Sequence, residues 1–315
     1  MARELLDVLE EVKEEYFGAE RGKYPFTEWE QKRERVRERL NHLPQYVEQA
    51  ASQIALQEGP GRPKKVDLYR RAMLFLFVRM LGKSNRNMEL LLELLEPLLG
   101  FTVNYKYIER LYSDEQVVLV LHNLFILLLQ EEGISGTFSG DGTGYSVSIS
   151  KHYRSHPRKK KAYKYTFRML DLETGMYVGV GYSTRSEMDA FTKALSMLTS
   201  YGVTIDTVAL DRYYSSRKVL SLFEKETSVY VIPKKNISII GFEWVKILKR
   251  ISEDPLSFVK KYFMRNLSEA GFSADKRRFG WMIAQKRPDR QEMAMFSIAL
   301  LHNVFAIRVK MADRQ

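Results

Sequence analysis

Apolar positions recur at helical spacing through the first 130 residues of the chain. Near the start they fall at Leu5, Leu6, Val8, Leu9 and Val12, roughly one face of a helix. The same reasoning predicts helices over 5–17, 32–40, 43–56, 67–81, 87–98, 105–112 and 113–130. The longest apolar stretch, 117–129, is interrupted by polar residues and is too short to span a bilayer, so we expect a buried helix there.

After residue 133 the pattern changes to alternating, β-branched and glycine-rich segments. It predicts strands over 137–149, 162–172, 175–182, 207–210, 228–232 and 279–285, with helices over 187–200, 215–223, 258–270 and 290–305. Three strands in series, followed by alternating helices and strands, predict a mixed α/β sheet with helices on its faces, preceded by an all-α region. We therefore divide the chain into 1–60, 61–133 and 134–315.

Composition narrows the class of protein. The chain has 315 residues, enough for two domains, and no cysteine, which excludes disulfides and thiolate zinc sites and suits a reducing cytoplasm. The N-terminus is charged from its third residue, so we expect no signal peptide, and we expect no membrane association.

Positive charge is concentrated in the second half. Residues 1–140 contain 19 Lys/Arg and 22 Asp/Glu, whereas residues 141–315 contain 31 and 17, a net +14. This basic field favours a polyanionic partner, and a plain solubility surface is the alternative.

A basic Gly- and Pro-rich break at 57–65 separates the first helices from a short helix pair joined by Gly82-Lys83-Ser84-Asn85. This pair could be a helix-turn-helix that binds DNA, with Arg62, Lys64 and Lys65 contacting the DNA backbone. The alternative is a helical bundle used for dimer contacts.

Three isolated carboxylates in the second half are suited to metal binding. Asp141 lies inside the first strand between two glycines, where an ionised side chain is costly unless paired or metal-bound. Asp211 ends the fourth strand, where ligands collect in open α/β sheets, and Glu269 falls on a later helix. Such a set suits two Mg²⁺ ions, or Mn²⁺, that clamp both oxygens of a phosphoryl transfer. Taken alone, an aspartate that ends a strand usually caps the next helix.

A spaced motif, Tyr262-x2-Arg265-x3-Glu269-x6-Lys276, surrounds the third carboxylate. Helical spacing places its first three residues on one face. Arg265 could bind a phosphate beside the scissile bond or simply pair with Glu269. The Tyr262 ring could contact DNA or pack in the core.

Further basic residues are candidate DNA contacts. We expect Lys276 and Arg277 to follow a turn at Gly271 and to reach the DNA backbone, although a solvated surface run would have the same composition. The segment 151–164, between the first two strands, has seven Lys/Arg and no acid, which favours a DNA backbone contact. Its basic residues are Lys151, Arg154, Arg158, Lys159, Lys160, Lys161 and Lys164. Its two histidines lack a third ligand, so we expect no zinc.

Together, Asp141, Asp211 and Glu269 with the spaced motif resemble the DDE transposases of prokaryotic insertion sequences, in the groups numbered four and five. Arg277-Arg278-Phe279-Gly280 and Leu301-His302-Asn303 are also similar to that group. The resemblance covers about residues 136–308 and implies an RNase H-like catalytic domain. Many relatives carry a large β-rich insertion between the second Asp and the Glu. Here 57 residues intervene, so any insertion is small, within Asn236–Asp254.

The resemblance implies a metal-dependent transposase: an endonuclease and strand transferase. It would bind the terminal inverted repeats of a mobile element, cleave the DNA and join the freed ends to target DNA. Its partners would be double-stranded DNA, both transposon ends and target, and a second copy of the chain in a homodimer. We expect a cytoplasmic, nucleoid-associated protein. The alternatives are a structure-selective nuclease of the same fold and a non-catalytic DNA-binding protein descended from a transposase.

Overall fold

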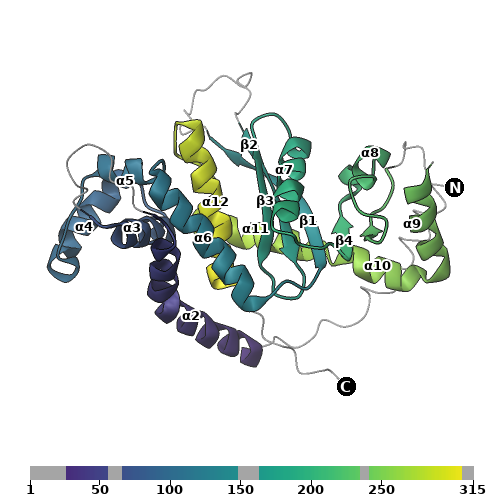
Figure 1. Cartoon of the computed structure of the whole chain (residues 1–315), viewed down its shortest axis with the longest axis horizontal. Coiled ribbons are helices and arrows are strands. Elements are labelled where there is room, and N and C mark those ends of the chain that lie inside the picture. Colours follow the sequence, from purple (N-terminus) through teal and green to yellow (C-terminus); the bar gives the residue numbers. More distant parts are fainter. Residues whose placement is uncertain (1–25, 56–65, 148–162, 235–240, 307–315) are drawn as a thin grey trace.

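A computed structural model describes residues 26–55, 66–147, 163–234 and 241–306 of the chain. Helices gather at one end of an elongated molecule, a mixed sheet occupies the middle, and a second group of helices lies at the other end (Figure 1). Before residue 133 the described residues form only helices: α2 (Phe26–Ser52), α3 (Leu68–Leu81), α4 (Asn85–Leu99), α5 (Tyr105–Leu111) and α6 (Glu115–Glu132).

Several of these helices begin at the polar residue that best satisfies their free N–H groups. Asp67 accepts a hydrogen bond from the Arg70 amide at the start of α3, and Ser84 accepts one from the Asn87 amide at the start of α4. Gly82 ends α3 in the left-handed conformation, with φ of 62°. The Gly82–Asn85 link is therefore a helix stop followed by a helix start.

Five strands form one mixed sheet in the order β3-β2-β1-β4-β5. They are β1 (Thr137–Ser146), β2 (Tyr163–Asp171), β3 (Tyr177–Ser183), β4 (Thr207–Leu210) and β5 (Ser228–Tyr230). β1, β2 and β3 are antiparallel neighbours, whereas β4 runs parallel to β1 and β5 parallel to β4. The last pair between β1 and β4 is Gly140 with Leu210, so β1 extends past the end of β4. The expected mixed sheet flanked by helices is confirmed.

Helices cover both faces of this sheet. α7 (Glu187–Ser200) packs on β2 and β3, and α11 (Asn266–Phe279) packs on β1 and β2. Near the fourth and fifth strands lie a short 3₁₀ turn, η1 (Arg212–Tyr214), and the helices α8 (Arg217–Leu220), α9 (Phe242–Glu253) and α10 (Pro255–Phe263).

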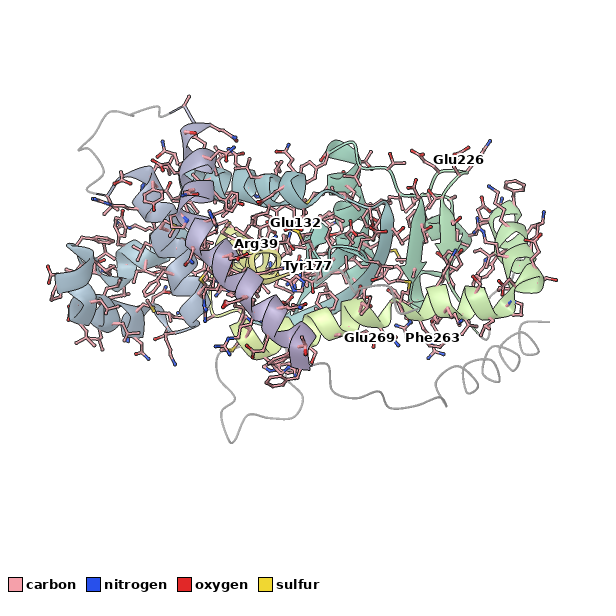
Figure 2. The ribbon with its side chains drawn as sticks, turned by 90° about the horizontal axis from the view of Figure 1, so that it is seen from below. Arg39, Glu132, Tyr177, Glu226, Phe263 and Glu269 are labelled. Atoms are coloured by element: carbon pink, nitrogen blue, oxygen red, sulfur yellow. The ribbon has the colours of Figure 1, made fainter. Side chains whose placement is uncertain are left out.

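The last helix, α12 (Pro288–Phe305), links the two halves of the molecule. It contacts β3 on one side and α2, α3 and α6 on the other. Arg39 of α2 donates from Nη1 to the Asn303 and Ala306 carbonyls at the end of α12, 2.9 Å each, and its Nη2 pairs with Glu132 of α6 (Figure 2). One hydrophobic core therefore runs from α2 to α12. The division of the chain into three regions stays a prediction.

Several predicted elements are wrong in detail. The two helices expected over 32–40 and 43–56 are one helix, α2. The helix expected over 258–270, with a turn at Gly271, is broken at Met264 and Arg265 instead, and α11 continues through Gly271 to Phe279. The strand expected over 279–285 is reduced to an isolated bridge between Ser146 and Met282. The interval 236–254 contains the helix α9, which was not predicted.

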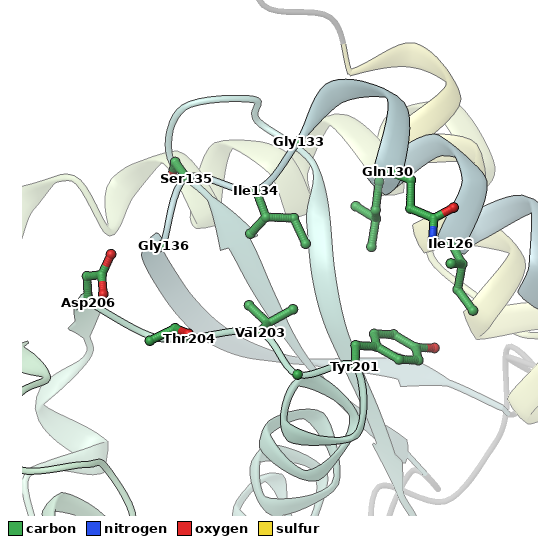
Figure 3. A pocket seen from close by; sticks show the side chains of 12 residues that line it. Ile126, Gln130, Gly133, Ile134, Ser135, Gly136, Tyr201, Val203, Thr204 and Asp206 are labelled. Atoms are coloured by element: carbon green, nitrogen blue, oxygen red, sulfur yellow. The ribbon is translucent and has the colours of Figure 1, made fainter.

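The structure has a cavity between the helical region and the sheet. It has a volume of about 530 Å³ and opens between the end of α6, the start of β1 and the loop before β4, lined by Ile134, Tyr201, Val203 and Asp206 among others (Figure 3). Within the described residues no single helix is long and apolar enough to cross a membrane. The α5–α6 pair, bent by 54°, passes that test only when its two helices are taken together.

Candidate active site

Asp141 lies on β1 one residue beyond the last pair with β4, where the strand still pairs with β2 through Arg168. Its Oδ1 accepts a hydrogen bond from the Gly142 amide, 2.8 Å long. Burial, opposed by that amide and reinforced by the nearby carboxylates Glu269, Glu187 and Asp211, raises the pKa of Asp141 to about 6. The folded protein therefore resists ionising this carboxyl group.

Asp211 follows β4 and caps η1, its Oδ2 accepting from the Tyr213 amide at 3.1 Å. The capping role and the position at the strand end coincide in one residue. The remaining oxygen, Oδ1, lies 3.6 Å from Nη1 of Arg265. Asp211 therefore uses one oxygen to hold the local turn and turns the other toward the helix that carries Glu269.

Glu269 lies in the first turn of α11, along the edge formed by α10 and α11 (Figure 2). Its Oε1 accepts a 2.5 Å hydrogen bond from Nη1 of Arg265, the atom that also faces Asp211. One guanidinium nitrogen thus lies between two of the predicted acids. The break between α10 and α11 falls at Arg265 and gives this side chain its position.

Tyr262 is 4% exposed and lies under Arg265, whose Cζ is 5.3 Å from the ring centroid. Although burial alone would lower the pKa of Arg265, Tyr262, Glu269 and Asp211 hold it above its ordinary value. The Arg265 Nε is buried and has no hydrogen-bond acceptor among the described residues. As placed, Tyr262 supports Arg265.

Lys276 lies near the C-terminal end of α11, and its Nζ donates to Oγ1 of Thr143, 2.5 Å away on β1. The same nitrogen lies 5.4 Å from the Tyr145 ring centroid and 5.3 Å from that of Trp281. Burial and the charge of Arg168 lower the pKa of Lys276, while Asp141 acts in the opposite direction. Lys276 is therefore close to Asp141, whereas Arg277 is exposed.

Glu187, the first residue of α7, was missed by the sequence interpretation. Its Oε1 accepts a 2.6 Å hydrogen bond from the buried Tyr214 hydroxyl. A Cβ built on Gly142 would lie 2.2 Å from the Glu187 Cδ, so the glycine beside Asp141 leaves the space that this carboxylate fills. The available signal was Gly142 itself, because a glycine inside a strand indicates close approach of another group.

The other predicted DNA-binding residues lie away from the three acids or outside the residues that the structure describes. Lys164 is 6% exposed at the start of β2, which leaves little of it for a DNA backbone. The remaining predicted basic residues fall outside the described residues: Arg62, Lys64, Lys65, Lys151, Arg154, Arg158, Lys159, Lys160 and Lys161. They stay predictions.

The donor chemistry of this edge suits a hard divalent cation, because it is made only of carboxylates. Within the described ranges no group of three or more His, Cys, Asp or Glu side chains is arranged closely enough to hold a metal ion. In this arrangement the Arg265 guanidinium lies between Asp211 and Glu269. Cation binding by these acids therefore requires Arg265 to move from between them.

Comparison with known proteins finds a curated relative and a solved structure that resemble this chain. No family model matches it. It is 64% identical over 308 residues to a protein of Archaeoglobus fulgidus described as "Probable transposase for insertion sequence element ISA1214", over 98% of this chain and 96% of that protein. Among solved structures, the piggyBac transposase synaptic complex with hairpin DNA has a TM-score of 0.45 at 10% identity, covering 84% of this chain and 70% of that one. A likeness at this TM-score carries no conclusion.

Proposed function

The chain belongs to the family of insertion-element transposases, and on that premise we propose that it cuts and joins DNA by metal-dependent phosphoryl transfer at Asp141, Asp211 and Glu269. One observation carries the proposal. Asp211 and Glu269, far apart in sequence, both pair with Arg265, and both act electrostatically on Asp141 at the same edge of the sheet. The strand order β3-β2-β1-β4-β5, with β4 and β5 parallel to β1, supports an RNase H-like catalytic domain.

The three carboxylates would hold two Mg²⁺ or Mn²⁺ ions. Bound there, the ions would activate a water or a 3′-hydroxyl and stabilise the leaving oxygen. Such ions would also remove the repulsion among the acids that raises the pKa of Asp141. Glu187, close to Asp141 and hydrogen-bonded by Tyr214, adds a fourth negative charge to the same edge.

The basic residues of the site would bind the DNA backbone. Arg265 has a buried Nε without an acceptor and forms ion pairs that a metal would compete for, so a phosphate oxygen is a suitable partner once the acids take up cations. Lys276 presents a point charge at Thr143, two residues beyond Asp141 on β1, and Arg277 is exposed next to it on α11. Joining two element ends would require two such sites, hence a homodimer on double-stranded DNA.

The test is cleavage of DNA that carries the element's own terminal repeats. We expect cleavage to depend on Mg²⁺ and to be lost in Asp141→Ala, Asp211→Ala and Glu269→Ala. Asp206→Ala is the matched control, because Asp206 precedes β4 at the opposite end of the strand from Asp211 and should leave cleavage intact. Wild-type cleavage by all three triad variants would refute the assignment.

The same assay separates the alternatives. A structure-selective nuclease would cut branched DNA without needing the element ends, whereas a transposase requires those ends. A non-catalytic descendant would bind the ends and cut neither substrate.

A further inference from the structure

A buried charged cluster joins α11 to the sheet and to α12 on residues that the proposed site does not use. Arg168 of β2 and Asp275 of α11 are both fully buried and form an ion pair, with Nη1 2.6 Å from Oδ2. The Tyr177 hydroxyl donates to the same oxygen at 3.0 Å, and Arg168 Nη2 donates to the Tyr145 hydroxyl at 3.3 Å. Opposite charges that are this buried contribute stability only when their hydrogen bonds are nearly complete.

His302 of α12 completes the cluster. Its Nδ1 lies 2.8 Å from Oδ1 of Asp275, and its Nε2 lies 3.0 Å from the Gly175 carbonyl oxygen. Both partners are acceptors, so the ring forms both hydrogen bonds only when it is doubly protonated. Asp275 then lies between two cations. Although its burial would raise the pKa of Asp275, His302 and Arg168 hold it below its ordinary value.

The next residue, Asn303, docks α12 to strand β3. The Asn303 side chain accepts from the Tyr177 amide at 2.7 Å and donates to the Tyr177 carbonyl at 2.8 Å. This explains the paired residues His302-Asn303 in structural terms: Asn303 fixes α12 on β3, and His302 extends from α12 to α11.

Two anchors on α11 face the sheet with the spacing of two helical turns. Ser268 meets Ser139 of β1, Oγ to Oγ 2.5 Å, and Asp275 meets Arg168 and His302. Between them Gly271 allows close approach, because a Cβ there would lie 2.8 Å from the Tyr177 hydroxyl. Residues seven apart share one face of a helix, so these contacts set both the rotation and the height of α11.

The site residues of α11 follow these anchors by one position each. Glu269 follows Ser268, and Lys276 follows Asp275. They are also seven apart and therefore share a neighbouring stripe of the helix. A rotation of α11 would move Glu269 relative to Asp211 and Lys276 relative to Thr143 at the same time.

We propose that Asp275 and His302, together with Arg168, are positioning residues that hold α11 at the rotation in which Glu269 and Lys276 face the metal-binding edge. The inference rests on the proposed function. Among the described residues neither Asp275 nor His302 has a hydrogen bond or ion pair to a predicted metal ligand, so their effect on the metal would be transmitted by α11. Arg168, in contrast, also lies opposite Asp141 across the β1–β2 pair, so the test rests on Asp275 and His302.

The experiment measures Mn²⁺ binding to the full chain by the loss of the free-ion electron paramagnetic resonance signal, without DNA. In Asp275→Asn and His302→Gln we expect the dissociation constant for Mn²⁺ to rise about tenfold, the lower end of the range for altered outer-shell partners of metal ligands. The double variant should bind no more weakly than Asp275→Asn, because His302 acts through Asp275. Single-turnover cleavage should require correspondingly more Mg²⁺.

Ser297→Ala is the matched control, because Ser297 is a buried, hydrogen-bonded residue of α12 that contacts Arg79 and is no part of the cluster. It should lower the melting temperature and leave Mn²⁺ affinity unchanged. If Asp275→Asn and His302→Gln also lower only the melting temperature, the cluster is structural and the proposal is wrong. Should Asp275→Asn fail to fold, Ser268→Ala tests the other anchor, and unchanged Mn²⁺ affinity in Ser268→Ala and His302→Gln would equally refute it. The metal site itself would be refuted by a different result: wild-type protein that binds no Mn²⁺, or that binds Mn²⁺ no more tightly than Asp141→Ala does.

Discussion

Replacing Asp141 by asparagine should stabilise the metal-free protein at neutral pH. Asparagine has the same shape and its Oδ1 can keep the bond from the Gly142 amide, but it carries no charge. Burial and the neighbouring acids raise the pKa of Asp141 from 3.8 to about 6. A shift of about 2 pKa units corresponds to about 3 kcal/mol of preference for the neutral form, taken as an upper value.

The sign of the pH dependence follows from this raised pKa. The folded state binds the Asp141 proton more tightly than the unfolded state does, so this group's stabilisation is complete below pH 3.8 and is lost as pH rises through about 6. Asp141→Asn has no such loss. At pH 7.5 in EDTA its melting temperature should exceed that of the wild type by about 5 °C, and the difference should shrink to about a third of that value at pH 4.5.

The assay is thermal unfolding followed by circular dichroism between pH 4.5 and 7.5, with and without Mg²⁺. Asp189→Asn is the control, since Asp189 is an acid of α7 whose pKa is lowered by hydrogen bonds from Ser183 and Lys193, and its replacement should bring no gain. Added Mg²⁺ should stabilise the wild type and not Asp141→Asn, which narrows the difference. Equal melting temperatures at pH 7.5, or a difference that does not depend on pH, would refute the reasoning.

Three further predictions concern contacts around the same edge and core. Gly142→Ala should destabilise the fold by about 1–3 kcal/mol through the clash with Glu187, and Glu187→Ala in the same chain should restore most of the loss in urea titrations; additive effects would contradict the contact. Arg265→Gln should bind Mn²⁺ more tightly than the wild type without DNA, because the guanidinium competes with the metal for Asp211 and Glu269, but it should cleave element ends more slowly. Unchanged Mn²⁺ affinity in this variant would exclude the competition. Arg39→Met should cost about 3 kcal/mol in urea unfolding by leaving Glu132 and the end of α12 unpaired, whereas Arg37→Met, at an exposed pair with Glu34, should cost little.

The sequence predicted the elements whose pattern is local. Strands β1 to β5 and helices α3, α4, α7 and α12 follow alternation, helical spacing and caps. The three acids were chosen by their places in the order of the elements and by the spaced motif around Glu269, and their role stays a prediction. The break between α10 and α11 could not be predicted in this way, because no glycine or proline marks it and the contacts of Arg265 with distant Asp211 coincide with it.

The sequence interpretation mainly missed contacts between segments that are far apart in the chain. Gly271 suggested a turn, but its missing side chain serves the packing of α11 against Tyr177, which only the assembled sheet reveals. Glu187 resembles any acid in the first turn of a helix, and its proximity to Asp141 depends on how α7 crosses β1. His302 was noticed as part of a motif, and its role depends on Asp275, 27 residues earlier.

The position of α12 also bears on how the protein is made. Residues 288–305 supply contacts to α2, α3, α6 and β3, so the core that joins the first helices to the sheet lacks one wall until they have been synthesised. A nascent chain still short of this helix would leave α11 without His302. A ribosome that stops early would therefore release a product with exposed apolar surface, which is prone to aggregate.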